Sequence, residues 1–142
     1  MLQLDGSGIP YFWDYVSSSA GYGFNGKGST AVNGGSWTHI AFIRNGREGS
    51  FYVNGLFNRA ITSAKSVSYR NHDVYIGYDG RDKTSAFSGD MTALVVYNVA
   101  LLPYQILYLY RATAATLGKV DIRLSIVVED DVYPYPSTIV CS

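Results

Sequence analysis

Six turn dipeptides divide the first eighty residues of this 142-residue chain into short segments. They are Asp5-Gly6, Asn25-Gly26, Asn33-Gly34, Asn45-Gly46, Asn54-Gly55 and Asp79-Gly80. Asn or Asp followed by Gly accepts the positive φ angles of tight turns, so the apolar runs on either side are expected to pair as antiparallel strands. Short strands between regularly spaced turns are typical of an all-β sandwich or barrel.

Strands are expected at residues 9–16, 21–24, 37–44, 50–53, 73–78 and 87–98, the last of them interrupted at Gly89. Alternation along 37–44 places Trp37, His39, Ala41 and Ile43 on one face and Thr38, Ile40, Phe42 and Arg44 on the other. Because both faces carry apolar residues, this strand is predicted to be central and covered on both sides.

Helix signals occur once in the chain. Pro103 suits the first position of a helix, and Ile106, Leu109, Tyr110 and Thr113 follow at helical spacing. A helix is therefore predicted at about 103–115, where its apolar stripe would cap an open end of the sandwich.

The C-terminal segment has a different pattern, so the chain divides into a sandwich over 1–118 and a strand with an extended tail over 119–142. Apolar residues alternate with mostly polar ones in this segment: Val120, Ile122, Leu124, Ile126 and Val128. This period of two predicts an extra strand with one buried face. The strand can pack on its own sandwich or pair with a partner chain, and the sequence leaves both open.

Composition limits the function classes. Charged residues make up 15% and the net charge is zero, so neither nucleic acid nor an anionic membrane surface is expected as a partner. Thirteen tyrosines favour neutral partners such as proteins or sugars, although tyrosine also suits strands. The single cysteine, Cys141, cannot form an internal disulfide. No signal peptide is visible, and no apolar run reaches the roughly 18 residues that a membrane span needs.

Four short motifs occur in a fixed order. They are Trp37 with His39, then Tyr52-Val53-Asn54-Gly55, then Tyr75-Ile76-Gly77, and finally Phe87, Gly89, Met91, Tyr97, Asn98 and Leu101 leading into the helix residues Ile106, Leu109 and Tyr110. Over roughly residues 36–110 this order resembles a laminin G-like (concanavalin A-like) jelly-roll domain. The resemblance implies an antiparallel jelly-roll β-sandwich used for binding or assembly, and it implies no reaction.

The N-terminal part departs from that family. Leu4-Asp5-Gly6 resembles the opening motif of such domains, but Leu4 precedes Trp37 by only 33 residues (37 − 4). The usual N-terminal strands are therefore expected to be absent, which would leave sheet edges that invite pairing with another chain. Components of virions or of surface structures fit this profile by analogy, and the sequence assigns no localisation.

Catalysis is not expected. A glucanase of this architecture needs two carboxylates flanking one bond, and the only glutamates, Glu48 and Glu129, lie far apart in the sequence. His39 is interpreted as a core histidine with its hydrogen bonds satisfied, because no nucleophile motif lies near it. A glucanase-like remnant without activity is the third interpretation, after an interaction module and a lectin.

Two groups of residues are candidates for ligand binding. Tyr11, Trp13 and Tyr15 share one face of a strand, and with Asn25 they could stack on a sugar or anchor a protein. The three aromatic residues could also belong to the core, and we expect this location. Asp79, Asp82 and Asp90 could hold calcium, but Arg81 and Lys83 offset their charge. No cofactor is therefore expected. The leading hypothesis is a non-catalytic module engaging other protein chains, or copies of itself, in a larger assembly, and the alternative is a lectin-like carbohydrate-binding domain.

Overall fold

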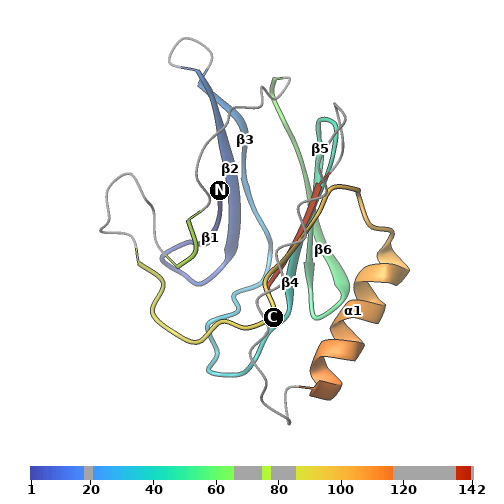
Figure 1. Cartoon of the computed structure of the whole chain (residues 1–142). Coiled ribbons are helices and arrows are strands. Elements are labelled where there is room, and N and C mark those ends of the chain that lie inside the picture. Colours follow the sequence, from blue (N-terminus) through green and yellow to red (C-terminus); the bar gives the residue numbers. More distant parts are fainter. Residues whose placement is uncertain (18–20, 66–74, 78–85, 117–136, 142) are drawn as a thin grey trace.

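Two antiparallel sheets and one helix form the protein in a computed structural model that describes residues 1–17, 21–65, 75–77, 86–116 and 137–141 (Figure 1). The first sheet has the order β1-β2-β3, formed by Leu2–Leu4, Pro10–Ser17 and Gly21–Lys27. The second has the order β6-β5-β4-β8-β7, formed by Leu56–Thr62, Glu48–Val53, Ile40–Asn45, Ser137–Cys141 and Val95–Tyr97. The helix α1 spans Pro103–Thr116. The predicted fold class, an antiparallel jelly-roll β-sandwich with one helix, is confirmed.

The two Asn-Gly turns build a three-stranded meander. Asn45 pairs with Glu48 across the first turn, where Gly46 has a φ of 59°. The second turn joins Val53 to Leu56, and its two residues, Asn54 and Gly55, have φ angles of 50° and 76°. Both turns use the left-handed conformations for which Asn and Gly are suited. The hairpin prediction for this segment is therefore confirmed.

The space between the two sheets is filled by four phenylalanines. Phe12 and Phe24 come from the three-stranded sheet, and Phe42 and Phe51 from the five-stranded one. Phe42 stacks on Phe12 with ring centroids 4.0 Å apart, and it meets Phe24 edge-on at 6.0 Å. These are the offset and edge geometries that aromatic rings prefer. The aromatic contact holds the two sheets together.

The opposite face of the five-stranded sheet is covered by α1. Ala41, Ile43 and Tyr52 form a buried cluster with Ile106 of the helix. The helix therefore packs on the outer face of this sheet, as Figure 1 shows, and the expectation that it caps an open end of the sandwich is wrong. The strand β4 carries core residues on both faces and is the middle strand of five, so its predicted central position is confirmed.

The start of α1 is closed by a reciprocal capping contact. The Leu102 backbone N–H donates to Gln105 Oε1 at 2.7 Å, and the Gln105 N–H donates to the Leu102 carbonyl at 2.9 Å. The first bond is one half of a capping box, in which a side chain three residues into the helix satisfies a free backbone donor, and the second is a backbone bond of the first turn. Pro103 then occupies the first helical position, where its missing N–H costs nothing.

Several strand boundaries differ from the predictions. The strand expected at 87–98 is only Val95–Tyr97, because Gly89 and Ala93 have φ angles of 153° and 49° that interrupt an extended chain. Trp37 lies before β4 and is 50% exposed, since the strand begins at Ile40. Tyr75, Ile76 and Gly77, the described part of 73–78, are not in a strand.

Besides the short β1, two strands were not predicted. In β6 the alternation is interrupted by Asn58, which is the extra residue of a β-bulge between Phe57 and Arg59. Its side chain instead accepts from Ser29 N and donates to Thr30 Oγ1. The other is β8, which pairs with β4 and β7 inside the chain's own sheet. The predicted strand through Val120, Ile122, Leu124, Ile126 and Val128 lies outside the described residues.

Candidate functional site

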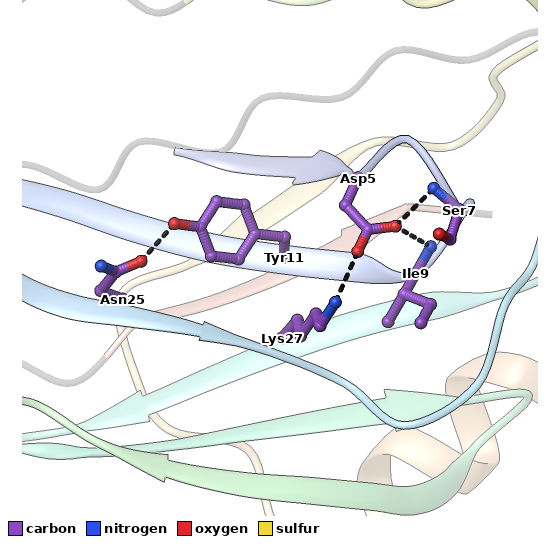
Figure 2. A network of polar contacts seen from close by, with 6 residues as sticks. All are labelled: Asp5, Ser7, Ile9, Tyr11, Asn25 and Lys27. Atoms are coloured by element: carbon purple, nitrogen blue, oxygen red, sulfur yellow. Dashed lines mark hydrogen bonds and ion pairs between the residues drawn. The ribbon is translucent and has the colours of Figure 1, made fainter.

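The outer face of the three-stranded sheet holds the first candidate surface. Alternation along β2 directs Phe12 into the core, so Tyr11 and Trp13 lie on the opposite face and are partly exposed. Trp13 pairs in register with Asn25, and the Tyr11 hydroxyl donates to Asn25 Oδ1 (Figure 2). The structure thus brings Tyr11, Trp13 and Asn25 together, and the expectation that the two aromatic residues are core is wrong, because the phenylalanines fill that place.

A third aromatic residue completes this face. Tyr22 of β3 meets Trp13 edge-on, with ring centroids 5.7 Å apart and planes at 89°. The backbone of Tyr15 pairs with Tyr22, while the Tyr15 side chain lies outside the described part of the chain. We call Tyr11, Trp13, Tyr22 and Asn25 the aromatic sheet face.

A polar network borders the aromatic sheet face at the β1–β2 turn (Figure 2). Asp5 Oδ1 accepts the backbone N–H groups of Ser7 and Ile9, each at 2.9 Å, and Asp5 Oδ2 lies 3.0 Å from Lys27 Nζ. The hydrogen bond from Ile9 and the contact with Lys27 lower the pKa of Asp5, since both favour its charged form. The Asp5-Gly6 turn predicted from the sequence is thereby tied to β3.

The second candidate surface is formed by α1 and the start of β6. Leu56, Phe57, Tyr104 and Tyr108 are exposed to 65%, 61%, 68% and 71%. A hollow of about 390 Å³ lies among them, lined by Tyr52, Gly55, Leu56, Phe57, Pro103, Tyr104 and Leu107. On the other side of Tyr104 a second hollow of about 320 Å³ is lined by Tyr97, Leu101, Gln105, Tyr108 and Leu109. We call Leu56, Phe57, Tyr104 and Tyr108 the helix face.

Close packing of the β5–β6 turn against α1 creates the first hollow. A Cβ atom at Gly55 would lie 3.0 Å from Leu107 Cδ1 and 3.0 Å from Tyr110 Cβ. Only glycine therefore lets the turn approach the helix so closely while also adopting a φ of 76°. The turn places Leu56 and Phe57 beside Pro103 and Tyr104 at one continuous apolar surface.

The helix face has little charge around it. The stretches Leu56–Thr62 and Pro103–Thr116 contain no Asp or Glu, and their charged residues are Arg59 and Arg111. The described part of this surface therefore presents apolar side chains, tyrosine hydroxyls and two guanidinium groups. Exposed tyrosines around an apolar hollow are common at protein interfaces.

Sequence reasoning missed the helix face, although a signal for it was present. Ile106, Leu109 and Thr113 form the stripe of α1 that faces the sheet, so an ordinary surface helix would carry polar residues on the other side. Tyr104 and Tyr108 lie there instead, four residues apart. Large apolar residues on both sides of a predicted surface helix indicate that its solvent side is also a contact surface.

His39 lies between the sheet and the helix. It is 3% exposed, its ring is 5.8 Å from the ring of Tyr110, and its backbone N–H donates to Asn54 Oδ1 at 3.0 Å. Burial lowers its pKa to about 4, so the imidazole is neutral near pH 7. Within the described residues, neither ring nitrogen has a hydrogen-bond partner. Its predicted core position is confirmed, but the expectation of satisfied hydrogen bonds is wrong.

The calcium candidates are not brought together by the described residues. Asp79 and Asp82 lie outside them, and Asp90 is exposed. Among the residues that the structure describes, no group of three or more His, Cys, Asp or Glu side chains could hold a metal ion. In the same part of the chain, α1 is too short to cross a bilayer, and no other helix is present.

Comparison with known proteins identifies the family. Residues 1–107 match the laminin G family that is described as the concanavalin A-like lectin/glucanases superfamily. Because 107 of the 142 residues match, the chain belongs to this family. The resemblance read from 36–110 is confirmed, and the match extends it to residue 1.

Other comparisons add less. No curated protein matches the chain. Among solved structures, the chain is similar to a crystal structure of an S-layer domain-containing protein from Clostridium thermocellum, with 18% identity and a TM-score of 0.45. The similarity covers 78% of this chain and 66% of that one, so the chain spans slightly less than two thirds of the solved structure's length.

Proposed function

We propose that this domain is a non-catalytic interaction module that engages other protein chains through the helix face, as a component of a larger assembly such as a virion or a cell-surface structure. The observation that supports this function is the exposure of Phe57 and Tyr104 at one apolar hollow and of Tyr108 at the neighbouring one. Contiguous apolar patches of this kind are rare on soluble monomers unless they bind something.

The absence of catalysis is part of the proposal. A glycosidase needs two carboxylates, from Asp or Glu, on opposite sides of one bond. Neither hollow of the described residues is lined by a carboxylate, and Glu48 lies exposed at the β4–β5 turn. The buried, neutral imidazole of His39 is also unsuited to act as a base on an external substrate. A family member that retains the sandwich without this machinery would serve binding alone.

Hydroxyl-radical footprinting of the full chain tests this function. The oxidation rates of Tyr104 and Tyr108 are compared between the isolated chain and material purified in its natural assembly. We expect both tyrosines to be protected in the assembly, while Tyr22, which is 49% exposed in β3 of the other sheet, keeps its rate. Equal oxidation of Tyr104 and Tyr108 in both samples would refute the proposal.

A second function, glycan binding, is supported by the aromatic sheet face. Trp13 and Tyr22 offer ring surfaces on which a sugar could stack, and Asn25 lies beside them with an amide group for hydroxyls. Titration with a panel of neutral glycans, with and without calcium, should change the fluorescence of Trp13 if a sugar stacks there. Trp13→Ala should abolish binding and Trp37→Ala should not. Binding that survives Trp13→Ala would exclude this face.

A further inference from the structure

We propose that the helix face is closed by a second copy of this chain, with the two α1 helices packed antiparallel about a two-fold axis between residues 109 and 110. This inference rests on the proposed function, because it names the partner of the same surface. A two-fold interface requires one patch that is complementary to itself.

The exposed side of α1 is a straight stripe. Tyr104, Tyr108, Arg111 and Ala115 are all exposed and are spaced by four, three and four residues. At about 100° per residue, these four positions fall within an arc of roughly 60°. The buried Ile106 and the partly buried Leu109 and Thr113 lie on the side that packs on the sheet or close to it. The stripe therefore points away from the protein's own core.

The stripe is complementary to itself when it is reversed. An antiparallel crossing with its midpoint between residues 109 and 110 places Tyr104 against Ala115 of the second copy, and Tyr108 against its Arg111. Both pairs share that midpoint, so one two-fold axis satisfies them together. A large ring against a methyl group lets two helices pack closely, and a guanidinium over a tyrosine ring is a favourable cation–π contact.

The size of the surface suits a dimer. Leu56, Phe57, Tyr104 and Tyr108, at the exposures given above, together present roughly 500 Å² of side-chain surface. A stable interface buries about 800 Å² on each partner. The exposed Arg111 and Ala115 of the stripe, with Ala112 next to it, supply surface toward the remainder. The C-terminal end of the second helix would then lie over the hollow between Leu56 and Tyr104.

Charge does not oppose this pairing. Arg111 is the one charged residue of α1, and in the antiparallel arrangement it faces Tyr108 rather than its own copy. The whole chain has a net charge of zero, so two copies do not repel one another at long range.

The mass of the full chain in solution, measured by light scattering over a concentration series, tests the proposal. We expect the mass to rise to twice the 15.6 kDa of one chain. Tyr108→Arg would face Arg111 of the second copy and should raise the dissociation constant by about 100-fold. Tyr108→Glu at the same position would instead meet Arg111 as an ion pair and should retain the dimer. Tyr22→Arg adds the same charge at an exposed position of the other sheet and should also retain it.

Thermal melts of each variant establish that it is folded, and Ala115→Arg provides a second variant at an exposed position where arginine is a good helix former. We expect Ala115→Arg to be a folded monomer. A wild-type chain that stays monomeric at its highest soluble concentration would overturn the dimer, as would equal losses for Tyr108→Arg and Tyr108→Glu. If Tyr104 and Tyr108 are nevertheless protected in the natural assembly, the proposed function stands with a different protein as partner.

Discussion

Phe42 stacks on Phe12 across the sandwich, with ring planes only 15° apart. Phe42 belongs to β4, whose neighbouring residues Ala41 and Ile43 point to the opposite face and pack against Ile106 of α1. One strand therefore holds both the second sheet and the helix. Loss of order in β4 should release both layers together, and the helix face would lose its support.

Phe42→Ala should lower the free energy of unfolding by about 3–5 kcal/mol, because it removes a fully buried ring and leaves a cavity between the sheets. Phe87→Ala is the matched control, since Phe87 is 41% exposed, and its cost should stay below about 1.5 kcal/mol. Urea unfolding followed by circular dichroism measures both. Similar costs for the two variants would contradict the assigned core.

Stability should fall with acid through His39. Its pKa is about 4 in the folded state against 6.5 when unfolded, so the unfolded chain binds more protons between these values. The folded state is therefore favoured fully above pH 6.5 and loses up to about 3 kcal/mol as the pH falls to 4. His39→Leu should remove this slope without loss of stability at pH 7, since the ring nitrogens have no partner among the described residues.

Unfolding free energies of both proteins from pH 4 to pH 8 check this prediction. The titration of Asp5 does not interfere in the pH range of the His39 effect. The pKa of Asp5 is lowered from 3.8, so its contribution to the free energy of unfolding is lost only at more acid pH. A wild-type slope that persists in His39→Leu would assign the acid sensitivity to another group.

Gly55→Ala should be more damaging than its backbone angle alone predicts. Gly55 and Gly35 have nearly equal φ angles, 76° and 77°, but an added Cβ touches nothing within 4 Å at Gly35 and lies 3.0 Å from Leu107 and Tyr110 at Gly55. Each substitution costs about 1 kcal/mol of backbone strain, and Gly55→Ala should cost about 1–2 kcal/mol more because α1 must shift. Chemical denaturation of both variants measures the difference. Equal costs would mean that the turn does not press on the helix.

Gln105→Ala should destabilise the protein by about 0.5–2 kcal/mol, because the Leu102 N–H loses its acceptor at the start of α1. Gln105→Glu keeps the acceptor and adds a negative charge near a helix N-terminus, so it should be neutral or slightly stabilising. Thermal unfolding distinguishes these outcomes. A harmless Gln105→Ala would show that the contact does not close the helix.

Local chemistry explains which parts of the fold could be predicted. The Asn45-Gly46 and Asn54-Gly55 turns determine their conformation within a few residues, so the central hairpins followed from sequence. Ala93 shows the limit, because its φ of 49° ended a predicted strand although alanine has no preference for that conformation. Tertiary packing imposes such angles, and a single sequence does not reveal them.

The candidate surfaces also combine features that local sequence predicts with features that depend on tertiary packing. Alternation correctly placed Tyr11 and Trp13 on the same side of β2. It did not show which side of the strand faces the core, since Phe12 is equally apolar. The helix face depends on the contact of Gly55 with Leu107, which joins residues that are distant in the chain. That surface could be described only once the helix had been placed on the sheet.

The central claim, that the helix face binds another protein chain, is tested most directly by a photo-activated cross-linking amino acid placed at Tyr104. The labelled full chain is incorporated into its natural assembly and irradiated, and the same label at Tyr22, on the other sheet, provides the control. We predict a covalent adduct between Tyr104 and a protein chain, which will be a second copy if the dimer is correct, with little product at Tyr22. Equal, low yields at both positions would contradict the account.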